Sequence, residues 1–94
     1  MATKRVDFTV TTKGGVTAYI LHVGLVPVLL TGGKGHLEVE IGTPQLLVWQ
    51  FAGMPGDSLS ITGQVGEQTV VQVTSSTIPP GSIHGAGFEK FTVK

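Results

Sequence analysis

Apolar and polar residues alternate along most of this chain, and a period of two is typical of β-strands that bury one face. The alternation is clear in residues 5–12, where Val6, Phe8 and Val10 share one face, and again in residues 36–41. Glycine and proline residues interrupt the pattern, and no segment shows the 3.6-residue period of a helix. The pattern therefore predicts an all-β chain, whose further inward-facing residues are Leu37, Val39, Ile41, Leu59, Ile61, Val71, Val73, Phe91 and Val93.

Two stretches, residues 16–30 and residues 46–48, are apolar on both faces. In the strand that contains the second stretch, Trp49 shares a face with Leu47 and Phe51, and the opposite face is largely apolar as well. We expect the indole ring to lie in the core, since aromatic residues on such a face are usually buried. The remaining apolar face needs a cover, either another element of this chain or another subunit.

Seven or eight short strands joined by glycine and proline turns predict a two-sheet antiparallel β-sandwich, immunoglobulin-like or jelly-roll-like in architecture. A small β-barrel is the alternative. Residues 1–94 are expected to form a single domain, which is the usual organisation at this length. Trp49 is placed similarly to the core tryptophan of immunoglobulin-like sandwiches, but the cysteine pair of those domains is absent, so the similarity concerns architecture alone.

Turn residues predict how the strands are connected. The short break after residues 5–12 favours an antiparallel hairpin with residues 16–23. Pro27 cannot donate a backbone hydrogen bond, so it places its segment at a sheet edge or a bulge. Pro55, Gly56 and Asp57 form a turn in which the Asp57 carboxylate bonds nearby amides. Residues 75–87 are expected to be the longest irregular segment, followed by a final strand over residues 88–93.

Composition excludes several classes of protein. The chain has no cysteine, so neither disulfides nor thiolate metal sites are available to it. Six basic and six acidic residues cancel, which leaves no electrostatic footprint for nucleic acid. No apolar run reaches the roughly 18 residues of a membrane span. The amino terminus has no hydrophobic signal core, which indicates a cytoplasmic start or a mature secreted domain.

Candidate metal ligands are scattered. The three histidines, His22, His36 and His84, match no spacing of a known ligand motif, and neither a metal nor a cofactor is expected. Glu38 and Glu40 share a strand face at a spacing that paired-carboxylate chemistry would tolerate. Adjacent outward carboxylates on a solvated strand are far commoner, so we interpret both as surface or edge residues.

One candidate pair has the residue types of a nucleophilic enzyme. Ser82 and His84 lie two positions apart and supply the hydroxyl and the base that an acyl-transfer enzyme requires. The Gly-x-Ser-x-Gly nucleophile elbow is missing, which favours an ordinary loop. Tyr19 is a further candidate for binding, because its hydroxyl is able to reach the rim of a largely apolar strand.

Together these features predict a non-catalytic β-sandwich module that recognises a glycan or protein surface and associates with itself as a homo-oligomer. Tyr19, Ser82 and His84 are its candidate binding residues. One alternative is a small apolar-ligand binding protein, entered beside residues 75–87. The other is a hydrolase that uses the pair Ser82 and His84.

Overall fold

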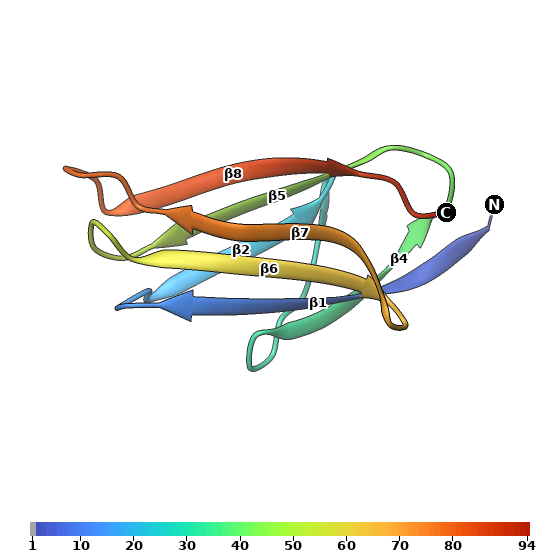
Figure 1. Ribbon diagram of the computed structural model, residues 1–94, viewed down its shortest axis with the longest axis horizontal. Helices are drawn as coiled ribbons and strands as arrows, with labels where there is room; N and C mark the ends of the chain where they lie inside the picture. Colours follow the sequence, from blue (N-terminus) through green and yellow to red (C-terminus); the bar gives the residue numbers. More distant parts are fainter. Residues whose placement is uncertain (1) are drawn as a thin grey trace.

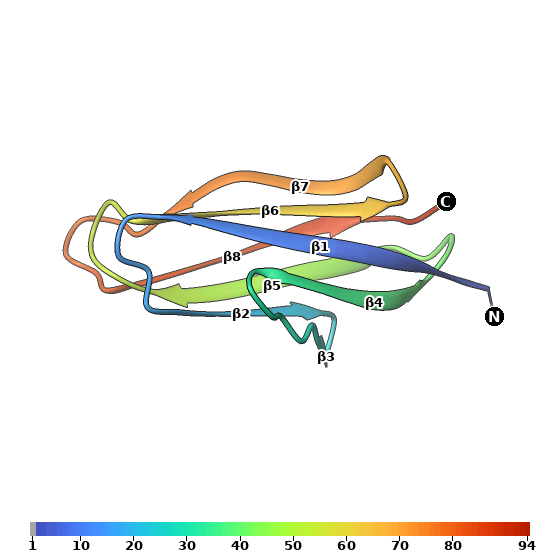
Figure 2. The same ribbon diagram turned by 90° about the horizontal axis from the view of Figure 1, so that it is seen from below.

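Two four-stranded antiparallel sheets face each other in the computed structural model, which describes residues 2–94 (Figure 1). The strand order is β4-β1-β6-β7 in the first sheet and β3-β2-β5-β8 in the second. Figure 2 shows β1, β6 and β7 in one layer and β2 and β5 in the other. Within the described residues the strands are β1 (Thr3–Lys13), β2 (Ala18–Val23), β3 (Val26–Pro27), β4 (Lys34–Glu40), β5 (Gln45–Ala52), β6 (Ser58–Val65), β7 (Gln68–Thr77) and β8 (His84–Phe91).

The sandwich prediction is confirmed. In residues 2–94 the two sheets remain separate along their strands and do not close into a barrel. At one end Gly42, after β4, donates its N–H to the carbonyl of Val93, after β8, at 2.7 Å. The same part of the chain contains no helix of the length and hydropathy that a membrane crossing requires.

The core lies between the sheets and contains most of the alternating residues that the sequence predicts, with Leu37 and Ile41 half-buried against it. Trp49, on the central strand β5, is only 5% exposed, so its predicted core position is confirmed. Its indole Nε1 donates to Ser76 Oγ on β7 of the opposite sheet at 3.0 Å. The ring therefore contributes apolar burial to the core, while its polar atom has a partner. The other buried apolar residues are Val6, Phe8, Val10, Leu21, Val23, Val28, Val39, Leu47, Phe51, Leu59, Ile61, Val71, Val73, Ile78, Phe91 and Val93.

The hairpin predicted between residues 5–12 and residues 16–23 is wrong. β1 pairs with β4 and β6, and β2 pairs with β3 and β5, so the two segments lie in different sheets. β1 is a central strand with both edges occupied, which leaves no place for β2 beside it. The chain instead crosses from one layer to the other at Gly14, whose φ of +89° is readily adopted by glycine.

The irregular segment predicted over residues 75–87 is much shorter than expected. β7 continues to Thr77, and β8 already begins at His84. Gly85 and Gly87 belong to β8 because each leaves space for a large ring of β5. A Cβ atom at Gly87 would lie 2.4 Å from the Trp49 ring, and one at Gly85 would lie 2.5 Å from the Phe51 ring. These glycines are thus packing residues inside a strand.

The remaining connections follow the turn chemistry. Pro27 lies in the two-residue edge strand β3, as expected, and the chain then leaves the sheet with Val28 buried. In the loop before β6, the Met54 N–H donates to Asp57 Oδ2 at 2.9 Å, which confirms the capping role of this carboxylate. Gly56 in the same turn has a φ of +93°.

Replacing Trp49 by Ala is expected to destabilise the fold by about 3 to 5 kcal/mol, because it leaves a cavity between the sheets. A loss of this size is a large fraction of the stability of a small domain. Urea unfolding followed by far-UV circular dichroism measures it. Trp49→Phe, which keeps most of the buried area, should lose clearly less. Equal stability of Trp49→Ala and the unmodified protein would contradict the core position of this ring.

Candidate functional site

The outer faces of the two sheets differ sharply in chemistry. On the β4-β1-β6-β7 sheet, most residues that point away from the core have polar or charged side chains. This follows from strict alternation, because Val6, Phe8 and Val10 take the inward positions of β1. The outward residues of this sheet include Arg5, Asp7, Thr9, Thr11, His36, Glu38, Ser60, Thr62, Gln72 and Thr74.

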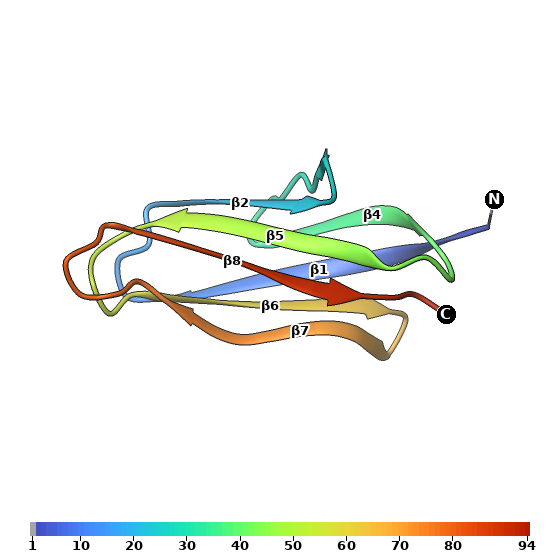
Figure 3. The same cartoon turned by 90° about the horizontal axis from the view of Figure 1, so that it is seen from above.

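The outer face of the other sheet is mainly apolar. Figure 3 shows β2, β5 and β8 side by side, and their registers align the outward residues in rows. Ile20 of β2 lies opposite Gln50 of β5, which lies opposite Ala86 of β8. In the next row His22 lies opposite Val48, and Val48 lies opposite Phe88. We call the outward residues Ile20, Leu46, Val48, Ala86 and Phe88 the apolar face.

Water covers much of this apolar face. Phe88 is 71% exposed, Ile20 is 51% exposed and Leu46 is 39% exposed. Scattered apolar residues are normal on protein surfaces, but here three strands contribute neighbouring ones. The described residues of a single chain thus leave uncovered the outward apolar side of this strand, which includes Leu46 and Val48.

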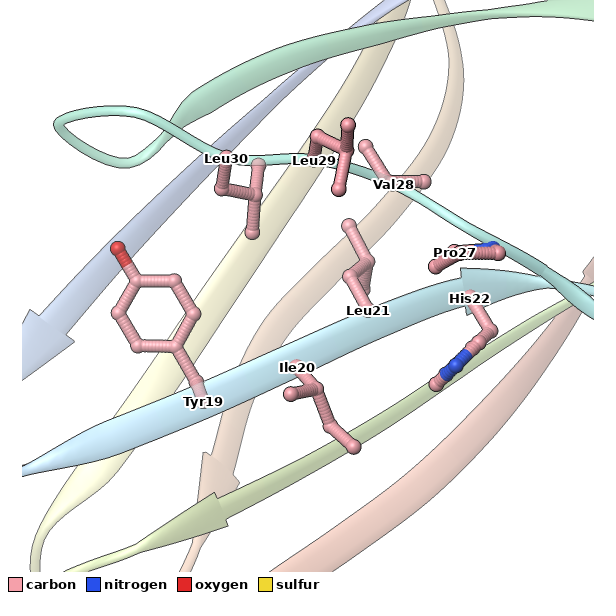
Figure 4. A pocket seen from close by; sticks show the side chains of 8 residues that line it. All are labelled: Tyr19, Ile20, Leu21, His22, Pro27, Val28, Leu29 and Leu30. Carbon is pink, nitrogen blue, oxygen red and sulfur yellow. The ribbon is translucent and has the colours of Figure 1, made fainter.

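Tyr19 is half-buried and lies at the rim of this sheet. It borders a groove of about 360 Å³ between β2 and the segment that follows β3 (Figure 4). The rest of the lining is Ile20, Leu21, His22, Pro27, Val28, Leu29 and Leu30. Tyr19 and His84 also border a shallower hollow of about 210 Å³, together with Ala18, Ile20, Gln50, Phe51 and Ala52. The structure therefore brings two of the three predicted binding residues to one hollow.

Ser82 and His84 are close, but they interact through the backbone. Ser82 Oγ accepts a hydrogen bond from the His84 N–H at 3.2 Å and donates to the His84 carbonyl at 3.0 Å. The hydroxyl is therefore hydrogen-bonded to both backbone groups of His84, the first residue of β8. A general base would need its imidazole, and not its amide, within reach of that hydroxyl.

The histidines do not converge. His22 and His84 lie on the β3-β2-β5-β8 sheet, and His36 lies on β4 of the other sheet. Residues 2–94 contain no group of three His, Cys, Asp or Glu side chains placed to hold a metal ion. Glu40 Oε1 accepts a hydrogen bond from Thr43 Oγ1 at 2.6 Å, and both it and Glu38 belong to the edge strand β4, as predicted.

Phe88 is the residue of this region that the sequence interpretation missed. The signal was present, because Phe88 has the opposite parity to Phe91 and Val93, which were predicted to point inward. Alternation therefore directs its ring to the outside, where the structure places it. No family model, curated protein or solved structure matches the chain.

Zinc is expected to leave the melting temperature of the protein unchanged. A metal that binds the folded state stabilises it by mass action, and three separated histidines give no such site. Thermal unfolding with and without an excess of zinc chloride tests this. A rise in melting temperature that disappears in His22→Ala or His84→Ala would reveal a histidine site that the structure of one chain does not assemble.

Proposed function

We propose that the protein is a non-catalytic β-sandwich module that associates with itself through the apolar face. The observation that carries this proposal is the exposure of Phe88, Ile20 and Leu46 on adjacent strands of one sheet. The opposite sheet carries mainly polar side chains on its outer face, so only one of the two sheets has an apolar outer face. Exposed apolar surface of this kind marks sites of protein association.

A protein surface fits the apolar face better than a glycan does. A sugar presents many hydroxyl groups, and each buried hydroxyl needs a hydrogen-bonding partner. Around the Phe88 ring the registers place mostly aliphatic residues, among them Val48 and Ala86. Apolar neighbours stabilise contact with an apolar protein surface, because its burial removes area from water at about 25 cal/mol per Å².

Self-association follows from the charge and chemistry of this face. Its five residues are uncharged; Gln50 and His22 are polar neighbours on the same side of the sheet, and Lys90, opposite Leu46 at its margin, is the charged one. Two copies related by a two-fold axis would therefore bring apolar surface against apolar surface. The bonding of Ser82 to the backbone of His84 supports a structural role for this pair and thus a module without catalysis.

The unmodified protein is expected to sediment at more than the chain mass of 9.8 kDa at tens of micromolar concentration. The double variant Ile20→Thr, Leu46→Thr should shift this equilibrium toward the monomer, because it removes apolar area from the face while keeping outward side chains that suit a strand or surface. Sedimentation equilibrium measures both masses.

Leu25→Thr is the matched control. Leu25 is 98% exposed, more than any residue of the apolar face, but it lies in the turn between β2 and β3. Its replacement should leave the mass unchanged if the face is the contact. A monomeric unmodified protein at these concentrations would refute the proposal, and equal effects of the control and the double variant would show that association depends on general surface hydrophobicity.

A further inference from the structure

No described strand pairs with the outer edge of β8, the last strand of the second sheet. β8 pairs with β5 on one side and ends the β3-β2-β5-β8 sheet on the other. Gly53, just after β5, donates its N–H to the carbonyl of Ile83, just before β8, at 3.0 Å. In the same register the odd-numbered residues of β8 bond to β5. The N–H and C=O groups of the even-numbered residues therefore point away from it.

The first of these outward-pointing residues is His84, whose backbone groups are already bonded by Ser82. The Ser82 hydroxyl bonds both the N–H and the carbonyl of His84. Three residues of the edge are left, Ala86, Phe88 and Lys90, and in residues 2–94 their outward backbone groups have no strand beside them. Such a row of donors and acceptors is a template for another strand.

The other three edges are protected in ways that β8 is not. β3 has two residues, and Pro27 is one of them. β4 carries Glu38 and Glu40, two carboxylates of like sign that discourage pairing, whereas the two charged residues of β8, Glu89 and Lys90, have opposite signs. β7 is irregular, with register shifts in its pairing to β6. β8 has no proline and pairs with β5 over eight residues without a shift, so it is the regular, open edge of the molecule.

From these features we infer that a second copy of the chain pairs with β8 along this edge, antiparallel and across a two-fold axis. The inference rests on the proposed self-association and concerns one part of the apolar face, the Phe88 ring at its edge, because Ile20 on β2 and Leu46 on β5 stay on the outer face of the paired sheet. One register satisfies all three free residues, with Phe88 opposite Phe88 of the second copy and Ala86 opposite Lys90 of the second copy. Each of these residues then exchanges both backbone hydrogen bonds with its counterpart.

This register also covers the most exposed ring of the apolar face. Phe88 points outward, so the two rings become cross-strand neighbours on one face of the joined sheet. No like charges lie directly opposite each other, because Glu89 faces Gly87 and Lys90 faces Ala86 of the second copy. The two sheets join as β3-β2-β5-β8 followed by the same strands of the second copy in reverse order. The apolar face becomes continuous across the dimer.

Hydrogen exchange measured by NMR on the unmodified protein tests this pairing directly. The amides of Ala86, Phe88 and Lys90 should be protected at concentrations where the protein associates and should lose that protection on dilution. The amides of His36 and Glu38 are the internal control. The Val10 N–H bonds the Gly33 carbonyl, and in that register both control amides point away from β1, toward the open edge of β4. They should exchange rapidly at every concentration.

Ala86→Pro gives a second, independent measurement. Proline removes the outward N–H of residue 86 while leaving the bonds of β8 to β5, and the two-fold axis removes two intermolecular bonds at once. The dissociation constant of the dimer should therefore rise at least about tenfold. Ala86→Ser, which keeps the N–H, should leave it unchanged, and circular dichroism verifies that both variants fold.

The outcomes separate this inference from the proposed function. Protected amides at Ala86, Phe88 and Lys90 support pairing along β8, whether the assembly is a dimer or a larger even-numbered oligomer. An assembly that is weakened by Ile20→Thr, Leu46→Thr, but in which these three amides exchange rapidly, would overturn the edge pairing and leave the proposed function standing. A protein that is monomeric at all concentrations would overturn both.

Discussion

The packing of the Trp49 ring between the two sheets is the interaction on which the rest of this structure depends. The ring fills the space above Gly87 on β8, and its nitrogen donates to Ser76 on β7. It thereby links the central strand of one sheet to an edge strand of the other. The β8 backbone lies so close to the ring that this position must be a glycine. The large side chain of β8, Phe88, is at the next position and points outward.

This arrangement divides the molecule into two unlike surfaces. The inward residues of both sheets pack in the core. The outward residues of the β4-β1-β6-β7 sheet are mainly polar, as is usual for a sheet face in contact with water. β2, β5 and β8 instead carry apolar side chains on both faces. A chain of this size buries a limited share of its surface, and this chain has no disulfide to compensate. Covering the remaining apolar face by association would supply burial that one copy lacks.

Much of the fold could be predicted from the sequence, because alternation reports directly on which residues point inward. Val6, Phe8 and Val10 illustrate this, as does Trp49. Pairing was harder to predict. A short break between two strands is compatible with a hairpin or with a crossing between layers, and what decided it at Gly14 was that β4 and β6 occupy both edges of β1. That competition between distant strands has no local signal.

The candidate site was predicted less well, for a related reason. Gly85 and Gly87 have the composition of a loop, and only the rings of Phe51 and Trp49 explain why they lie in a strand. With that strand extended to His84, Ser82 and His84 change from a candidate catalytic pair into the bonded start of a sheet edge. The homo-oligomer predicted from the two-sided apolar stretches stays a prediction, now with a defined face.

Fluorine NMR of the protein labelled at its phenylalanines tests the central claim, that one outward ring is left for a second copy to cover. Of the four rings, those of Phe8, Phe51 and Phe91 are buried in the core, and Phe88 alone is exposed. The account predicts three resonances whose chemical shifts change neither between H2O and D2O nor with the protein concentration. The fourth should respond to the solvent when the protein is dilute and become shielded as the concentration rises. A fourth resonance that stays solvent-sensitive at every concentration, or four that never respond, would contradict it.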